Sequence, residues 1–349
     1  MSDIDPVLLT SATKILKELT TSHTVHGLED GAWSDDLWTA LEQDGWTDIA
    51  LAEKHGGAGL NWSSIAAFLE LCGYYNLPAP IAEHILASRL SSDAGQSPAQ
   101  GPMSLALSPR CPPLDLKAEG DIWSACGTLE AVPWGRHASA IVAQGMYDGA
   151  LKLVTIDPSG AELTKSENLA GEPRDSLKLD KCKLTVKPYD QERSNNTLPL
   201  YALARAAMMA GAMGRVLELT VEYAGEREQF GRPIAKFQAV QNHLAIMAEE
   251  VSAATLAVGA AAAAIDTDKE LAMNATAKII NGKAASQICK RAHAVFAAIG
   301  FTREHELNLS TRRLWAWRDE AGSEATWSKR LGTIVLNEGG DGLWPWLTD

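Results

Sequence analysis

The sequence predicts a mainly α-helical protein with a central antiparallel β domain. Residues 1–98 and 197–349 carry apolar side chains at helical spacing, whereas residues 99–196 carry short apolar runs bounded by Gly, Pro, Asp and Asn. In the central region, the run SLKLDKCKLTV alternates with a period of two, which is typical of a half-buried strand. Small residues dominate the C-terminal helical stretches and permit the close helix packing of an antiparallel bundle.

We therefore expect an N-terminal helical domain over residues 1–98, a middle β domain over residues 99–196 and a C-terminal helical bundle over residues 197–349. In the first domain, helices are expected over DPVLLTSATKILKELT, SDDLWTALEQDGW and WSSIAAFLELCGYY. In the third domain, we expect three long helices followed by a shorter pair. A length of 349 residues suits two or three packed units.

The composition argues against several classes of function. A formal net charge of -13 and a pI of about 5.1 disfavour nucleic acid and anionic membranes as partners. The N-terminus shows no basic leader before an apolar core, and no window approaches the ~18 apolar residues that a membrane span needs. The five cysteines are scattered and the eight histidines lack ligand spacing, so we expect no disulfide framework and no metal site. These features predict a reduced, cytoplasmic protein.

The segment REQFGRPIAKFQAVQ, residues 227–241, interrupts the helical pattern with polar and aromatic residues. The Arg227 guanidinium offers a planar fork of donors that suits a pyrophosphate. Gly231 allows a sharp turn, and Gln238 can present both a donor and an acceptor. The alternative is a plain turn between two helices, with Arg227 in a surface ion pair with Glu222 or Glu226.

Four segments, in the right order and spacing, resemble the acyl-CoA dehydrogenase family. They are LAEKHGGAGLNWSSIAAFLELCG, LAGEPRDSLKLDKCKLT, REQFGRPIAKFQAVQNHLA and AIGFTREHELNLSTRR. The resemblance implies that family's helical domain, β-barrel or sheet domain and C-terminal four-helix bundle, with FAD as the cofactor. It further implies that this chain binds the adenosine–pyrophosphate end of a FAD that belongs mainly to a neighbouring subunit. The residues at the family's positions for this contact are Arg227, Gln229, Phe230, Ile234, Phe237 and Gln238.

The family's chemistry needs a carboxylate base, which removes an α proton while the β hydrogen leaves as hydride to the flavin. The two positions that supply this base in the family fall here on Ala321 and Tyr201. Alanine cannot accept a proton, and an unactivated phenol with a pKa of ~10 is a poor base. The nearby carboxylates Asp319, Glu320 and Glu324 would each need a shift in register, with Glu320 as the alternative base. Their plainer interpretation is a solvated cluster at a helix junction.

Two further departures concern the flavin site. The family's Thr-Glu-Pro and Gly-Ser-Asp loop is absent, with Pro109 as its only trace. Ser124 and Thr128 are candidates for the strand hydroxyls that meet the flavin ring, and the alternative is that they are ordinary surface hydroxyls.

The family's Gln-x-x-Gly-Gly-x-Gly-Tyr segment is also altered. Its Gln falls on Ala294 and its paired glycines on Ala297 and Ala298, while Gly300 and Phe301 match. Methyl groups at the glycine positions would crowd a pyrophosphate, which leaves the arginine segment as the main grip.

The resemblance is to the base-lacking subunit of bacterial α2β2 acyl-CoA dehydrogenases that act on steroid side-chain CoA thioesters. It implies that this chain lends the adenosine side of the flavin site to a homologous partner that carries the catalytic Glu and most of the acyl-CoA site. An electron-transferring flavoprotein is the family's usual acceptor. Two alternatives are a self-sufficient homotetramer with a relocated carboxylate and a structural subunit that binds neither flavin nor thioester.

Overall fold

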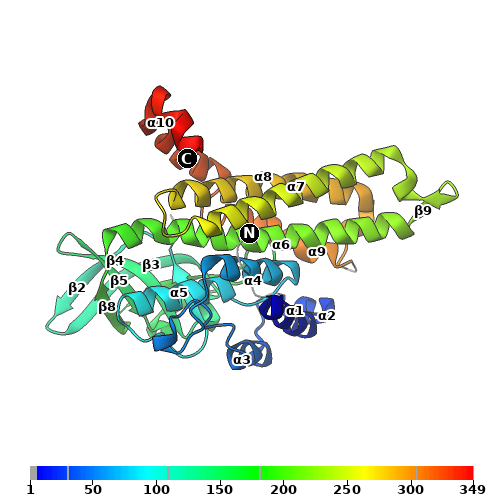
Figure 1. Cartoon of the computed structure of the whole chain (residues 1–349). Coiled ribbons are helices and arrows are strands. Elements are labelled where there is room, and N and C mark those ends of the chain that lie inside the picture. The colour runs from blue at the N-terminus through cyan, green and yellow to red at the C-terminus, as the bar shows by residue number, and fades with distance from the viewer. Residues whose placement is uncertain (1–5, 30, 108–110, 181, 304, 349) are drawn as a thin grey trace.

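The computed structural model describes residues 6–29, 31–107, 111–180, 182–303 and 305–348. Helices precede and follow a sheet, as the sequence predicts, so the mainly α class with a central sheet region is confirmed. Figure 1 shows the long helix α6 running through the middle, with the N-terminal helices on one side and α7 and α8 on the other. The predicted domain boundaries at 98/99 and 196/197 stay a prediction.

The helices are α1 (Pro6–Leu19), α2 (Ser22–Gly27), α3 (Asp35–Gln43), α4 (Trp62–Tyr74), α5 (Ile81–Asp93), α6 (Gln191–Glu226), α7 (Gln238–Ala263), α8 (Glu270–Phe296), α9 (Leu307–Asp319) and α10 (Glu324–Thr348). The strands of the large sheet are β1 (Met103–Ala106), β2 (Leu114–Glu119), β3 (Ile122–Pro133), β4 (Ala140–Tyr147), β5 (Ala150–Ile156), β6 (Glu162–Thr164), β7 (Arg174–Leu179) and β8 (Leu184–Pro188). The short strands β9 (Glu228–Gln229) and β10 (Arg232–Pro233) pair with each other.

The large sheet follows the order β6-β7-β3-β2-β4-β5-β8, with β1 beside β4. Most neighbours are antiparallel, as predicted, and β1 and β2 in addition each pair with β4 in parallel, which the sequence did not indicate. The partners in each parallel pair are joined through other strands, and local periodicity cannot reveal the direction of such a distant neighbour.

The alternating run SLKLDKCKLTV does not form one strand. It supplies the end of β7, where Leu177 and Leu179 are buried and Lys178 is exposed, and then the start of β8. The period of two therefore predicts the burial pattern correctly, whereas the turn between β7 and β8 is missed.

Two glycines bring the N-terminal helices against the bundle. A Cβ built on Gly73 of α4 would collide with the carbonyl oxygen of Met208, and one on Gly211 of α6 would collide with that of Glu70. Because only glycine fits at such close backbone approach, this crossing fixes α4 against α6.

Helix α7 is long and apolar enough to cross a membrane by length and composition, and 22% of its most apolar window is buried. It packs against α6 and α8 on one side and leaves a face of small and apolar residues exposed, including Leu256. An exposed apolar helix face of this kind is typical of a subunit interface.

The backbone at Ala297, directly after α8, has φ 55° and ψ -139°. A non-glycine residue rarely adopts such a conformation, and its cost is about 1–3 kcal/mol. The turn thus keeps a glycine-like conformation although the residue is alanine.

We expect Ala297→Gly to stabilise the protein by about 1 kcal/mol, because relief of strain exceeds the ~0.4–1 kcal/mol of added unfolded-chain entropy. Thermal and urea unfolding of the full chain would measure it. Ala298→Gly is the control, since Ala298 has no positive φ and should lose stability. An equal loss in both variants would contradict the assigned strain.

Candidate functional site

The arginine segment forms a projecting turn at the far end of the bundle, where β9 lies in Figure 1. The Ile234 N–H donates to the Arg227 carbonyl at 2.8 Å and closes the base of the turn. Phe230 and Gly231 between the two short strands both have positive φ, 54° and 77°, as a type I′ turn requires. A tight turn therefore holds the residues of this segment outside the body of the bundle.

The predicted flavin-tail residues differ in exposure. Arg227, Gln229, Phe230 and Gln238 are exposed, whereas Ile234 and Phe237 are half-buried. The structure brings Phe230 and Phe237 together edge to face, with ring centroids 6.1 Å apart.

Phe230 is 93% exposed, an unusual state for a phenylalanine without a covering partner. The sequence missed the Arg232 guanidinium, which lies 4.4 Å from the Phe237 ring centroid. An Arg directly after the turn glycine, Gly231, and five residues before an aromatic residue is the signal that could have suggested this contact.

The Arg227 guanidinium is available to an external ligand. Within the described part of the chain, no hydrogen bond or ion pair engages it, so the alternative of a surface ion pair with Glu222 or Glu226 is not what the structure shows. A free guanidinium beside an exposed aromatic ring fits a pyrophosphate and an adjoining flat group on another chain. The residues present therefore fit the adenosine–pyrophosphate end of FAD.

The two family base positions are both buried and both unsuited to proton abstraction. The Tyr201 hydroxyl, on α6, donates to Glu83 Oε1 of α5 at 2.7 Å. Burial raises the pKa of Tyr201 well above its usual range. Ala321 is 5% exposed, and its carbonyl accepts a hydrogen bond from Trp327 Nε1 at 2.8 Å.

Glu320 is half-buried, with 17% of its side chain exposed, and takes part in an ionic network, so its interpretation as part of a solvated cluster is wrong. Arg174 of β7 binds it with two nitrogens, Nε at 2.7 Å from Oε1 and Nη2 at 2.9 Å from Oε2. Arg205 of α6 adds Nη2 at 3.0 Å from Oε2, and Asn168 donates to Oε1 at 3.1 Å. The carboxylate is therefore held by four donors from three parts of the chain.

This environment removes the basicity that the alternative base would need. Burial alone would raise the pKa of Glu320, but the charges of Arg174 and Arg205 outweigh it and lower that pKa to about 2. A general base works best when its pKa lies near the operating pH. Glu320 is thus arranged as a permanent counter-ion for two arginines.

The network extends in both directions from Glu320. Arg205 also pairs with Glu83, and Arg174 pairs with Glu172 at 3.0 Å. Glu172 accepts the Trp317 indole N–H at 2.9 Å and lies 3.3 Å from Arg313 Nε. The cluster of Glu83, Glu172, Glu320, Arg174, Arg205 and Arg313, called here the Glu320 network, balances three negative with three positive charges.

The other two carboxylates at this junction behave differently. Asp319 is exposed, and Glu324 accepts from Arg318 Nε at 2.7 Å. Lys278 of α8 donates to the carbonyls of Trp317 and Arg318 at 3.1 and 2.7 Å, which satisfies the C-terminal end of α9. Burial lowers the pKa of Lys278 to about 8.

The two candidate strand hydroxyls lie on the surface of the sheet. Thr128 is exposed on β3 opposite Lys178, and Ser124 is half-buried opposite Lys117. Their contact with a flavin ring stays a prediction, as does the alternative of ordinary surface hydroxyls. Pro109 lies outside the described residues.

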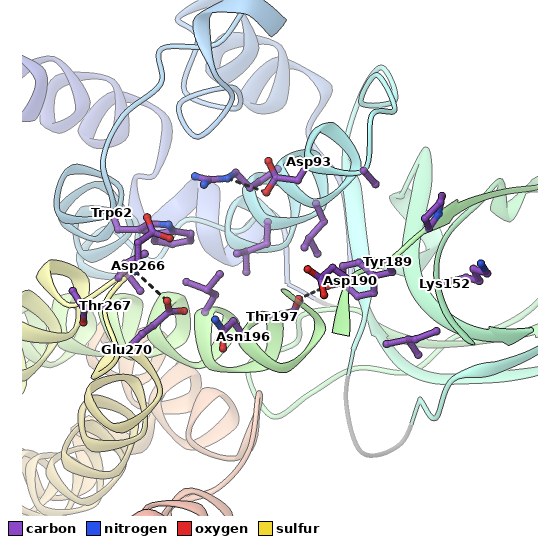
Figure 2. Close-up of a pocket in the computed structure, with 18 of the residues that line it drawn as sticks. Trp62, Asp93, Lys152, Tyr189, Asp190, Asn196, Thr197, Asp266, Thr267 and Glu270 are labelled. Atoms are coloured by element: carbon purple, nitrogen blue, oxygen red, sulfur yellow. Dashed lines mark hydrogen bonds and ion pairs between the residues drawn. The ribbon is translucent and has the colours of Figure 1, made fainter. Parts of the chain in front are cut away.

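A cavity of about 1090 Å³ is lined by the start of α6 as far as Leu200, the residue before Tyr201. Figure 2 shows it between α5, the start of α6, the sheet and the α7–α8 connection. Its charged lining residues are Asp93, Asp190, Asp266, Asp268, Glu270, Arg89 and Lys152. Because carboxylates outnumber cations there, the cavity repels the phosphates of a CoA thioester. Among the described residues, no group of three His, Cys, Asp or Glu could hold a metal ion.

We predict that Glu320→Gln lowers the free energy of unfolding by about 3–5 kcal/mol, because it leaves two buried arginines without their shared carboxylate. Urea unfolding at pH 7 would measure the change. Asp319→Asn removes the adjacent exposed carboxylate and should stay within about 0.5 kcal/mol. Equal effects of the two substitutions would contradict the assignment.

The difference in stability between the native chain and Glu320→Gln should also depend on pH. The folded-state pKa of Glu320 is depressed to about 2, so its contribution is complete above the unfolded pKa of ~4.3 and is lost as the pH falls toward 2. The stability gap between the native chain and Glu320→Gln should therefore be flat from pH 8 to pH 6 and shrink below about pH 4.5. A gap that grows in acid would contradict the depressed pKa.

Known proteins show the same architecture. The acyl-CoA dehydrogenase C-terminal domain family matches residues 192–326. The acyl-CoA dehydrogenase IpdE2 of Mycolicibacterium smegmatis is 27% identical over 285 residues, which cover 80% of this chain and 82% of that protein. The acyl-CoA dehydrogenase FadE34 of Mycobacterium tuberculosis is 28% identical over 89% of this chain and 44% of its own length.

Solved structures agree at the level of the fold. A chain of the ChsE4-ChsE5 complex from Mycobacterium tuberculosis superposes with a TM-score of 0.87 at 21% identity, over 97% of this chain and 99% of that chain. A chain of the Tcur3481-Tcur3483 steroid ACAD G363A variant gives 0.86 at 22% identity, over 95% and 97%. Together with the motifs and the helix–sheet–helix order, these similarities lead to one assignment. Residues 192–326 match the C-terminal domain of the acyl-CoA dehydrogenase family, and the chain as a whole is similar in sequence and fold to acyl-CoA dehydrogenases, oxidoreductases that act on CH–CH bonds with FAD as the cofactor.

Proposed function

We propose that this chain is the subunit without a base in a heteromeric acyl-CoA dehydrogenase. In this proposal it lends the adenosine–pyrophosphate side of the flavin site to a homologous partner, which carries the catalytic Glu and holds the acyl-CoA. The observation that carries the proposal is the Glu320 network, which fills the region of Tyr201 and Ala321 with paired charges. In this proposal, the paired charges leave room for neither an acyl chain nor a basic carboxylate.

The proposed roles of the two subunits follow from the chemistry of this chain's own residues. Arg227 binds a pyrophosphate with its free guanidinium, and Gln238 at the start of α7 orients the adjoining group. Phe230 gains a covering partner that its exposed ring lacks in the single chain. When bound, FAD supplies the hydride acceptor for the dehydrogenation, and the proton transfer belongs to the partner's carboxylate.

The relatives support a two-chain enzyme. The ChsE4-ChsE5 structure is a complex of two differently named chains, and the Tcur3481-Tcur3483 protein is described as a steroid ACAD. FadE34 is more than twice as long as its match to this chain, so the matched part is only one portion of that dehydrogenase. We therefore propose a steroid side-chain CoA thioester as the substrate, an electron-transferring flavoprotein as the acceptor and the cytoplasm as the location.

Two alternatives are less well supported. A self-sufficient homotetramer would need Glu320 as its base, yet four donors hold that carboxylate and its pKa is about 2. A subunit with a purely structural role would have no use for the free Arg227 guanidinium or for the exposed Phe230 ring.

Co-expression with a homologous acyl-CoA dehydrogenase subunit tests the proposal. We expect the pair to co-purify with FAD and to oxidise an acyl-CoA, and the chain alone to be colourless and inactive. In the complex, Arg227→Ala should weaken FAD retention about 10–100-fold, the loss of one charge-assisted bidentate contact. Absorbance at 450 nm after dialysis reports the retained flavin.

Arg232→Ala is the matched control, because Arg232 lies in the same turn but packs on Phe237. It should leave flavin retention within about threefold, a change of less than ~1 kcal/mol. A yellow, active protein obtained from this chain alone would refute the proposal.

A further inference from the structure

The cavity of about 1090 Å³ in Figure 2 has no part in the proposed function. Its described lining includes no member of the Glu320 network, although Leu200 of the lining directly precedes Tyr201. The volume lies at the upper end of the range of small-molecule sites, roughly 300–1,000 Å³. Lining residues come from α4, α5, the start of α6, β5 and the α7–α8 connection, so the fold fixes the walls from several directions.

One end of this cavity is strongly negative. The α7–α8 connection and the first residue of α8 supply Asp266, Asp268 and Glu270 to the lining. Glu270 is 6% exposed, its Oε2 accepts the Asp266 N–H at 3.1 Å, and burial raises the pKa of its carboxyl. Within the described residues, no Lys or Arg forms an ion pair with any of the three. The three carboxylates therefore stand together without a counter-ion.

The two cations of the lining do not neutralise this end. Arg89 pairs with Asp93 on its own helix, with Nε 3.4 Å from Oδ2. Lys152 belongs to β5, and Figure 2 shows it on the sheet side of the cavity, away from Asp266 and Glu270. The negative end is thus available to a cation from outside the chain.

Trp62, the first residue of α4, brings an unused hydrogen-bond donor to the same end. The residue is 6% exposed, yet no described hydrogen bond engages its indole N–H. Trp62 lines the cavity, and its N–H is not sealed among protein atoms as that of Trp46 is. In Figure 2 its ring lies beside Asp266, on the same side of the cavity as Glu270. Because buried donors normally have an acceptor, this N–H indicates a ligand that carries one.

Apolar side chains form a further part of the walls. Leu86 and Leu90 of α5 are 2% and 8% exposed, and Leu200 and Ile265 are half-buried. The hydrocarbon part of a ligand gains free energy by leaving water for such a surface. The cavity thus combines an uncompensated negative end, an unused donor and apolar walls.

We propose that this cavity binds a small organic cation that has an apolar body and a hydrogen-bond acceptor near its ammonium group, the chemistry of an amino alcohol or an amino ether. The ammonium group pairs with Asp266 and Glu270, and the acceptor takes the Trp62 N–H. The hydrocarbon part lies along the leucines of α5. The proposal stands without the proposed function, because it needs neither a partner chain nor a flavin.

Three probes of matched length separate the two polar contacts. 3-Butoxypropylamine has an ammonium group and an ether oxygen, octylamine lacks the oxygen, and 3-butoxypropan-1-ol lacks the charge. Ligand-observed NMR titration of the purified full chain at pH 7, where an amine with a pKa of ~10 is charged, gives the three dissociation constants. We expect 3-butoxypropylamine to bind about tenfold more tightly than the alcohol.

Two substitutions should each lower one preference. Asp266→Asn should reduce the preference for 3-butoxypropylamine over the alcohol about threefold or more. Asn tolerates the φ of 64° at this position, so the turn should persist. Trp62→Phe keeps a ring but removes the N–H, and should reduce the preference for 3-butoxypropylamine over octylamine about fivefold. Unchanged thermal unfolding would show that both variants fold.

The controls are matched residues outside the cavity: Glu249→Gln, an exposed carboxylate on α7, and Trp46→Phe, a buried tryptophan whose N–H also has no partner. Both should leave the two preferences within about twofold of the native chain. Equal affinity of the native chain for the amine and the alcohol overturns the proposal. So do preferences that the controls lower as much as Asp266→Asn and Trp62→Phe.

The outcome is independent of the flavin experiment. Arg227 follows the end of α6, whereas the start of α6 lines this cavity. Arg227→Ala should therefore leave the binding of all three probes unchanged. A failure of flavin retention in the heteromer would contradict the proposed function and leave the cation site untouched.

Discussion

The clamp of Arg174 and Arg205 on Glu320 is the interaction on which the rest of the structure depends. It joins β7, α6 and the end of α9, and through Glu83 it reaches α5. Isolated buried charges are costly, so each member of the network needs its partners to remain in the core. The N-terminal helices, the sheet and the bundle are therefore tied together at one charge-balanced point.

The same interaction supports the chemistry that we propose for this chain. By resemblance to the family, the base positions fall on Ala321 and Tyr201, and the paired charges of the network lie beside both of them. At the opposite end of the bundle, the arginine turn projects with a free guanidinium and an exposed ring. In the proposed function, the chain therefore has no base at these two positions and offers the arginine turn to a cofactor held by another chain.

Most of the fold could be predicted because helical and strand periodicities are local. The helices before and after the sheet follow from apolar spacing, and the arginine turn follows from a Gly between polar and aromatic residues. The parallel pairing of β1 and β2 with β4 could not be predicted, since it depends on strands that are distant in sequence. The end of β7 at Leu179 was likewise missed inside an unbroken alternating run.

The Glu320 network was missed for a related reason. Arg174 and Arg205 lie more than a hundred residues from Glu320 along the chain, and Asp319, Glu320 and Glu324 look alike in sequence. One local signal was present: Arg205 stands alone in the apolar stretch YALARAAMMA, and a lone charge on a buried helix face needs a counter-ion. The exposure of the Phe230 ring in the single chain could not be predicted in this way, because no local sequence signal indicates it.

The most direct test of the account measures α-proton exchange. The purified chain, supplied with FAD and an acyl-CoA in D2O, is followed by NMR for loss of the thioester α-proton signal, which reports a working base without any electron acceptor. The account predicts exchange at the rate of buffer alone. Saturable exchange by the isolated chain would show that it carries its own base and would contradict the central claim.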